Sequence, residues 1–207
     1  MAKKKQTVED QNLENVQEAL NTTSVWIEKN QNKLTWAVTI IVVLVVGALA
    51  LNTYVIKPKA VEASNENAKA VAYFMQGDWE KALNGDDAEC IGFQAVADEY
   101  KCYQAGKLAA LYTGVCYYQM GQFEDAAAYL NKFSADDLTI EPAALQLLGD
   151  AYVQMEDFAK AVKAFEAAAK SGNELIAPMS LKKAGLVYLE LGDKAAAKKA
   201  FETIKTD

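Results

Sequence analysis

Three stretches of this sequence repeat one pattern and decide its fold: GVCYYQMGQFEDAAAYL (residues 114–130), GDAYVQMEDFAKAVKAF (149–165) and GLVYLELGDKAAAKKAF (185–201). Each stretch begins with a glycine, and successive glycines lie 35 and 36 residues apart. After each glycine, a tyrosine follows at three residues, an alanine at twelve, and a leucine or phenylalanine at sixteen. A fixed period of this length is typical of a solenoid. The pattern predicts stacked units, each made of a helix, a tight turn and a second helix.

The residue types fit such a unit. A glycine in the first helix lets the second helix approach closely, and the small alanine serves the same crossing from the other side. We expect the tyrosine and phenylalanine to fill the space between repeats. A single helix pair cannot cover its own apolar faces, so neighbouring units must stack and share a core.

This pattern resembles the tetratricopeptide repeat, whose consensus has Gly or Ala at position 8, Tyr at 11, Ala at 20 and an aromatic residue at 24. The usual alanine at position 27 is present as Ala168 in the second unit, but Phe133 and Ile204 replace it in the others. The resemblance implies an all-α fold with three repeats in residues 107–207. We expect the C-terminal cap to be missing, which would leave Phe201 and Ile204 partly uncovered unless a partner or neighbouring chain covers them.

Residues 57–106 are interpreted as a linker helix and a degenerate first repeat that carries an insertion. The repeat spacing is kept by Ala70, Tyr73, Gly77, Trp79 and Ala82. The polar sequence NGDDAE (84–89) then interrupts the unit, and a new helix is predicted from about Ile91 to Tyr100. NGDDAE lacks the alternating spacing of a calcium loop, which favours a polar turn.

An uncharged run, LTWAVTIIVVLVVGALALNTYVI (34–56), precedes the repeats. As a helix it would be about 34 Å long, enough to cross a hydrocarbon core of about 30 Å. It therefore predicts a single transmembrane helix, followed by a break or kink at Pro58. Ala48-Leu49-Ala50 has the form of a signal-peptide cleavage site, but the long segment of mixed charge in front favours an uncleaved anchor.

Residues 1–33 form a polar to amphipathic N-terminal tail. A short amphipathic piece within it has Ser24 as a plausible cap. The tail would either lie along the membrane surface or dock on a membrane partner, or it would be weakly ordered, and the sequence favours neither reading. The lysines at positions 3–5 and the acidic repeat domain favour a cytoplasmic N-terminus and a periplasmic domain, although the lysines near the span are nearly balanced.

Composition argues against several kinds of function. The chain has no histidine, which removes the commonest general base and zinc ligand, so we expect no catalytic residues, no metal site, no cofactor and no small-molecule substrate. From Ala60 onward the net charge is −9, which argues against nucleic-acid binding. Cys116 is expected in the core, and Cys90 could pair with Cys102 only if Cys90 lies in the loop before the next helix.

The repeat resemblance also implies a protein-binding groove along the first helices. Its expected residues are Leu111, Tyr118, Gln119, Gln146, Asp150, Gln154, Lys182 and Glu190. Each of them could instead pack against the adjacent unit. These side chains are unlike those that clamp a peptide carboxylate, so extended or helical client segments fit better. In the membrane helix, Gly47, Ala48 and Ala50 would permit close approach of another helix.

The order of tail, anchor and repeats resembles bacterial inner-membrane proteins of the YfgM type, which are ancillary to the Sec translocon. The segments IEKNQ, KPKAVEA, EKALNGD and GKLAALYTG also resemble a tetratricopeptide membrane protein widespread in Bacteroidetes. The resemblance implies a non-enzymatic adaptor or scaffold in secretion or envelope assembly. Its partners would be translocon or other membrane-complex subunits, chaperones and secreted clients. The alternative is a cytosol-facing membrane receptor that binds clients for import or complex assembly.

Overall fold

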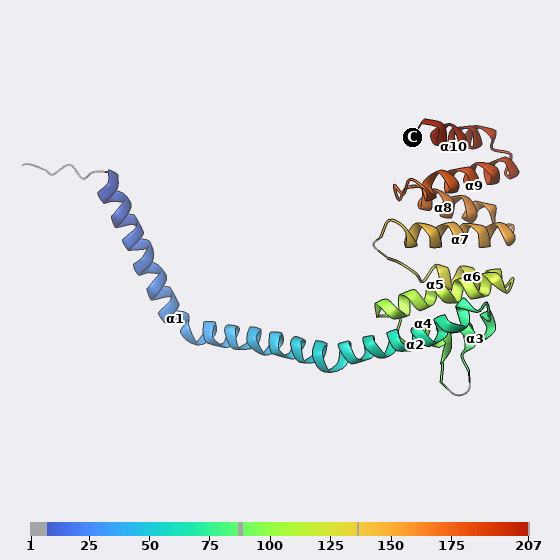
Figure 1. Ribbon diagram of the computed structural model, residues 1–207. Coiled ribbons are helices and arrows are strands. Elements are labelled where there is room, and N and C mark those ends of the chain that lie inside the picture. Colours follow the sequence, from blue (N-terminus) through green and yellow to red (C-terminus); the bar gives the residue numbers. More distant parts are fainter. Residues whose placement is uncertain (1–7, 87–88, 136, 207) are drawn as a thin grey trace, which may run out of the picture. The chain divides into compact units, whose positions relative to one another are not determined.

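The computed structural model describes residues 8–86, 89–135 and 137–206, and no strand occurs among them. The chain divides into two units, residues 1–56 and 57–207 (Figure 1). The first is a single run of helix, whereas the second is a stack of helices. The all-α prediction is therefore confirmed for the described part of the chain.

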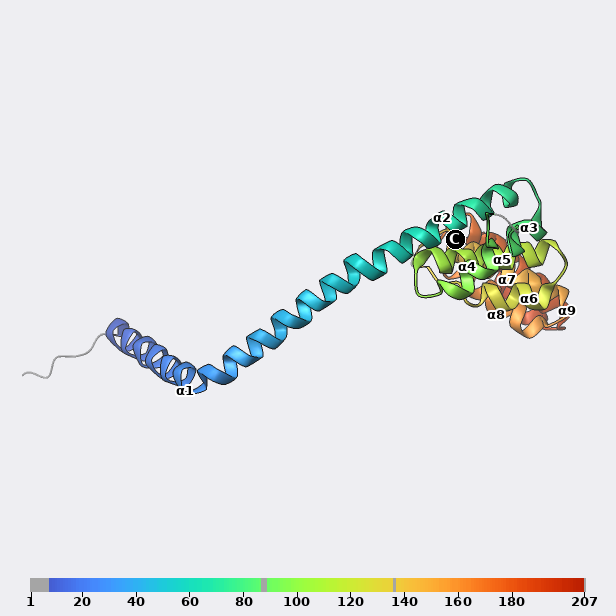
Figure 2. The ribbon, with the colours of Figure 1, turned by 90° about the horizontal axis from the view of Figure 1, so that it is seen from below.

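The first unit consists of α1 (Val8–Leu51) and the π-helical segment η1 (Asn52–Ile56), drawn as one uninterrupted ribbon in Figure 2. No separate helix begins at Ser24, whose hydroxyl donates to the carbonyl oxygen of Asn21 at 2.9 Å. The hydroxyls of Thr35 and Thr39 likewise donate to carbonyls four residues earlier, each at 2.8 Å. The expectation of a cap at Ser24 was wrong because these hydroxyls bond to their own helix.

The apolar run is exposed from Thr35 to Ile56, and only its first residue, Leu34, is half-buried. The described helix Ser24–Met75 is long and apolar enough to cross a membrane, and its most apolar window has a mean hydropathy of 2.7 with none of it buried. Leu44 is 66% exposed and Ile41 is 59% exposed. Length and composition alone give weak evidence for a span, because a signal sequence meets the same test.

Pro58 does not end the helical structure. Helix α2 (Lys57–Met75) contains Pro58 as its second residue and begins directly after η1. The helix is thus not broken at Pro58, but the α-helical pattern changes to a π-helical turn directly before it, and the wider hydrogen-bonding pattern of that turn accommodates a residue that has no N–H.

In the second unit, α2 is followed by α3 (Trp79–Asn84), α4 (Gly92–Glu99), α5 (Gln104–Gln119), α6 (Phe123–Leu130), α7 (Ile140–Gln154), α8 (Phe158–Ala169), α9 (Ile176–Glu190) and α10 (Lys194–Thr206). Figure 1 shows these helices stacked in chain order. The pairs α5–α6, α7–α8 and α9–α10 carry the three stretches of sequence in which the glycine, tyrosine and alanine pattern recurs. The shorter helices α3 and α4 pack with α2 and α5 and occupy the place of the degenerate unit.

The glycine at each helix crossing faces a large side chain of its own repeat. A Cβ atom added to Gly149 would lie 2.5 Å from Cε1 of Phe165, and one added to Gly114 would lie 2.6 Å from Cγ of Leu130. The close approach predicted for the glycine is confirmed. Phe165 fills space within its own repeat and shares a buried cluster with Val187 of the next one.

The repeated tyrosine ties each unit to the one before it. The hydroxyl of Tyr117 donates to Gln94 at 3.1 Å, and that of Tyr188 donates to Glu166 at 2.7 Å. The hydroxyl of Tyr152 instead accepts from the amide of Asn131, at 2.9 Å. In all three cases the partner lies 21–23 residues earlier, in or just after the preceding short helix.

The corresponding tyrosine of the degenerate unit, Tyr73, has a partner in the insertion. Its hydroxyl donates to Asp86, and this bond is the main cause that raises the pKa of Tyr73. The other carboxylate oxygen of Asp86 accepts from the backbone N–H groups of Glu89 and Cys90 at 2.7 and 3.0 Å. The described part of NGDDAE is thus a polar turn, while residues 87 and 88 lie outside the described residues.

All three cysteines are free. The disulfide considered between Cys90 and Cys102 is therefore not formed. Cys90 is buried, whereas Cys102 is exposed. Cys116 is fully buried as predicted, and burial raises the pKa of its thiol to about 12.

Candidate protein-binding surface

The first helices of the repeats line the inner side of the stack. Helices α5 and α7 approach within 8 Å between Cα atoms, as do α7 and α9, whereas no described residues join α6 to α8 or α8 to α10 in this way. Helices on the inner side of a curved solenoid lie closer together than those on the outer side. The predicted groove residues are all carried by these three inner helices.

On α5, two of the three predicted groove residues contribute to packing. Leu111 and Tyr118 are half-buried against the cluster that contains Leu148. The ring of Tyr118 also meets that of Phe123 edge to face, with centroids 5.4 Å apart, and burial raises the pKa of the tyrosine. Gln119 is exposed, so among these three it is the one open to a ligand.

On α7, two predicted groove residues join this helix to α9. The amide of Gln146 donates to the hydroxyl of Ser180 at 3.1 Å, and Asp150 forms an ion pair with Lys183 at 2.5 Å. Gln154 is exposed. Two of the three polar side chains in the middle of the groove, Gln146 and Asp150, therefore make contacts between repeats.

On α9, the predicted residues Lys182 and Glu190 are both exposed, and an apolar row accompanies them. This row, called here the α9 stripe, has exposed fractions of 74% at Leu175, 49% at Met179, 50% at Leu186 and 47% at Leu189. The spacing of Met179, Leu186 and Leu189, which are seven and three residues apart, was the signal that could have identified this stripe.

A groove between α9 and α10 continues the stripe at Leu189. Its lining consists of Leu189, Lys194, Ala197, Lys198, Phe201 and Glu202. Phe201 is 36% exposed, whereas the equivalent Phe165 is 1% exposed because α9 packs over it. Ile204 is half-buried. Phe201 and Ile204 are thus partly uncovered, as the sequence predicted.

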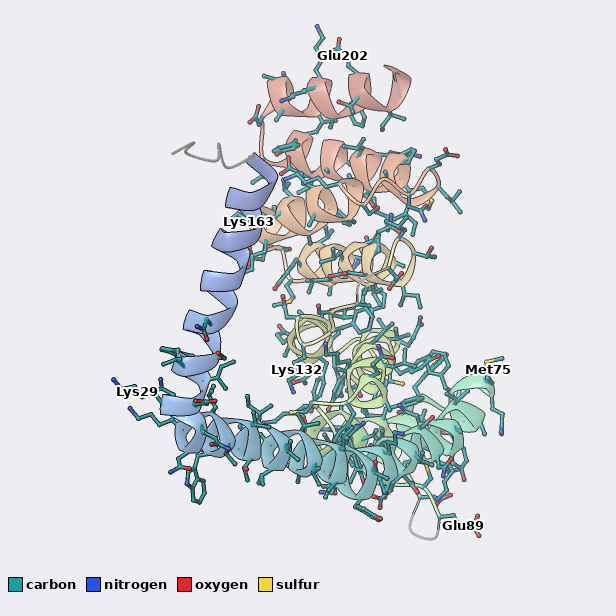
Figure 3. The ribbon with its side chains drawn as sticks, turned by 90° about the vertical axis from the view of Figure 1, so that its left-hand side faces the viewer. Lys29, Met75, Glu89, Lys132, Lys163 and Glu202 are labelled. Carbon is teal, nitrogen blue, oxygen red and sulfur yellow. The ribbon has the colours of Figure 1, made fainter. Side chains whose placement is uncertain are left out.

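The edge of this groove is basic. Lys198 forms an exposed ion pair with Glu202, at 3.6 Å, and such pairs contribute little binding energy. Figure 3 labels Glu202 on α10, where its side chain points away from the stack. Lys182 and Lys194 are exposed and form no ion pair with any described residue.

The small residues of α1 do not share one side of the helix. Gly47 and Ala50 are three residues apart and lie on one side, whereas Ala48 is turned by about 100° from Gly47. A Cβ atom added at Gly47 would meet no atom within 4 Å. A single partner helix could contact Gly47 and Ala50 together but not all three residues.

Among the described residues, no group of three or more Cys, Asp or Glu side chains could hold a metal ion. The exposed predicted residues Gln119, Gln154, Lys182 and Glu190, together with the α9 stripe, make the candidate site a surface of apolar, amide and charged side chains. Surfaces of this kind bind other polypeptides through packing and hydrogen bonds.

Comparison with known proteins agrees with the repeat pattern. Residues 108–136 and residues 147–206 match family models described as tetratricopeptide repeat. No curated protein matches the chain. The fold is similar to that of a solved structure, "Crystal structure of MamA", with 23% sequence identity and a TM-score of 0.53 over 65% of this chain and 71% of that one. This chain therefore contains tetratricopeptide repeats, and these indicate a scaffold for protein–protein interaction.

Proposed function

We propose that this chain is a membrane-anchored adaptor whose tetratricopeptide repeats bind proteins at the bacterial inner membrane, in secretion or envelope assembly. The observation that carries the proposal is the exposed apolar run of α1 on a chain whose other unit is a repeat scaffold. The repeats supply binding, and the anchor decides where that binding takes place.

The exposure of α1 supports the anchor on energetic grounds. Leaving apolar surface in water costs about 25 cal/mol per Å², and no described part of the run's most apolar window is buried. A bilayer would remove this cost for all sides of the helix together. Trp36 and Tyr54, which are 69% and 80% exposed, lie near the two ends of the run, where interfacial aromatic residues are found.

The proposed orientation has the N-terminus in the cytoplasm and the repeats in the periplasm. The proposed partners are subunits of the Sec translocon or of another membrane complex, together with chaperones and secreted clients. The order of anchor and repeats supports this assignment, as does the acidic, arginine-free repeat unit, which is a poor partner for nucleic acid.

The proposal can be tested by recovering the full chain from bacterial membranes in mild detergent after chemical crosslinking. We expect translocon or envelope-assembly components among the crosslinked partners. A matched variant, Gln119→Ala with Gln154→Ala, alters two exposed groove side chains without touching the core and should reduce their recovery. Exclusive recovery of cytosolic proteins would contradict the proposal and favour a cytosol-facing receptor.

A further inference from the structure

A row of tryptophan and lysine side chains lies on one side of α1, where the apolar run begins. This row, called here the Trp–Lys row, consists of Trp26, Lys29, Lys33 and Trp36. Its members are three, four and three residues apart, which is the spacing of neighbours on one side of a helix. Trp26 is 57% exposed and Trp36 is 69% exposed, and both lysines are exposed. The row therefore presents two aromatic surfaces and two cations together.

The row lies on the outside of a bend in α1. The ribbon of α1 changes direction within its own length (Figures 1 and 2), and Figure 3 places Lys29 at this bend with its side chain pointing away from the helix. The hydroxyls of Thr35 and Thr39 donate to their own helix here, a contact that often bends helices. A hollow on the other side of α1 marks the inside of the bend and is lined by Ile27, Gln31, Leu34, Thr35, Val38 and Thr39.

The two lysines of the row form no ion pair with any described residue. Glu28 is the one acidic residue in the sequence from 21 to 56. It is turned by about 100° from Lys29 and by about 140° from Lys33 around the helix. The preceding acid, Glu18, is eleven residues before Lys29, which is about 16 Å along a helix. The side of α1 that carries the row is therefore cationic.

The bend also sets the depth of the row in a bilayer. In a straight helix, Trp26 would stand about 12 Å beyond Leu34, the first residue of the apolar run. The headgroup layer on each side of the hydrocarbon core is only about 5–7 Å deep. Because α1 bends here, Trp26 can lie within that layer together with Trp36.

These side chains suit the headgroup of an anionic phospholipid. Lysines four residues apart have Cβ atoms about 5–6 Å apart, so both ammonium groups can reach one phosphate. Their apolar stems can pack along the helix while the charges reach the headgroup layer. Tryptophan is enriched at the boundary between headgroups and acyl chains.

We propose that the Trp–Lys row binds the headgroup of an anionic phospholipid at the membrane surface. Lys29 and Lys33 hold its phosphate, and the indoles of Trp26 and Trp36 pack against its glycerol region. This inference rests on the proposed membrane anchor, because the apolar run that begins at Leu34 brings the row to the level of the headgroups.

The test compares two lipids on the full chain by native mass spectrometry. The chain is purified in mild detergent and mixed with equal amounts of phosphatidylglycerol and phosphatidylcholine that carry the same acyl chains. The measured quantity is the ratio of the two lipid adducts. Lys29→Gln combined with Lys33→Gln removes both charges of the row. Lys57→Gln combined with Lys59→Gln is the matched control, because lysines two residues apart point to different sides of a helix and cannot share one headgroup.

We expect the parent chain to retain phosphatidylglycerol in at least about fivefold excess over phosphatidylcholine, since one lysine near an anionic lipid surface contributes roughly this factor. The variant without Lys29 and Lys33 should lose this excess, whereas the control should keep it. Trp26→Ala should lower the amount of bound phosphatidylglycerol by about threefold or more, because it removes an aromatic contact. Inorganic phosphate in large excess should leave the lipid adduct in place.

Equal retention of the two lipids by the parent chain, or an equal loss of preference in the two lysine variants, would overturn the inference. Displacement of the lipid by inorganic phosphate would also overturn it, because the row would then bind a free anion. If the chain shows no lipid preference but still floats with membranes in a density gradient, the inference is wrong and the proposed anchor stands.

Discussion

The two units expose the same residue types to very different degrees. In α1, Ile40 is 54% exposed and Leu44 is 66% exposed, whereas Val96 and Leu130 in the repeat unit are 0% and 3% exposed. The repeats bury their apolar side chains by stacking on one another. Among the described residues of the first unit, no helix packs against α1, and its apolar side chains stay exposed. The difference teaches that the same residue types can form a buried core in one region and an exposed apolar surface in another.

The largest expected effect comes from charging the middle of the apolar run. Val43→Asp combined with Val46→Asp should disfavour membrane insertion by about 5–7 kcal/mol, because an aspartate at the centre of a span costs about 2.5–3.5 kcal/mol. Density-gradient flotation should then find the variant in the soluble fraction. Val61→Asp, at a side chain that is 59% exposed in α2, is the control and should still float. A double variant that floats like the parent would refute the lipid-facing role of α1.

The next effect compares two equivalent phenylalanines. Phe165→Ala should lower the free energy of unfolding of the repeat unit by about 3–5 kcal/mol, because it empties a fully packed site. Phe201→Ala should lower it by only about 1–2 kcal/mol, because this side chain is 36% exposed rather than 1%. Urea titration followed by circular dichroism measures both. Equal losses would show that α9 does not cover Phe165 in the way described.

A smaller effect is expected at the helix crossing. Gly149→Ala adds a methyl group 2.5 Å from the ring of Phe165 and should destabilise the repeat unit by about 1–3 kcal/mol. Gly47→Ala adds the same group where no atom lies within 4 Å, so it should leave stability unchanged or slightly raised. Thermal denaturation of the two variants measures the difference. An unchanged melting temperature for Gly149→Ala would contradict the close approach.

The smallest effect concerns the tyrosine link between repeats. The hydrogen bond to Glu166 raises the pKa of Tyr188 from 10.0 to about 12, so the phenol is held in its protonated, donating form. Because the folded pKa is the higher one, this stabilisation is complete below about pH 10 and is lost as the pH rises toward about 12. Tyr188→Phe should therefore show a shallower fall in stability over this range. An identical pH profile for parent and variant would contradict the link.

Local spacing predicted much of this fold. The glycine, tyrosine and alanine at fixed steps identified the three helix pairs, because each pair repeats one packing problem. The helix after the insertion was predicted from about Ile91 and begins at Gly92. The cap at Ser24 was wrong, since a hydroxyl can bond to its own helix, and of the break or kink expected at Pro58 the break does not occur, since a π-helical turn can accommodate a proline.

The groove could be predicted less well. Its positions came from the repeat pattern, but the partners of Gln146 and Asp150 lie 34 and 33 residues away on the next inner helix. Such pairings depend on how the repeats stack, which no local pattern encodes. The α9 stripe could not be predicted for the same reason, because the exposure of Leu186 and Leu189 depends on which side chains the neighbouring helices leave uncovered.

The most direct test of the central claim, a repeat scaffold presented outside the cytoplasm by a membrane anchor, is labelling of Cys102 in the full chain. Cys102 is the exposed cysteine, whereas Cys90 and Cys116 are buried. A membrane-impermeant maleimide should label the chain in intact bacterial spheroplasts, and Cys102→Ser should abolish the signal. Labelling that appears only after the spheroplasts are lysed would contradict the account and assign the repeats to the cytosol.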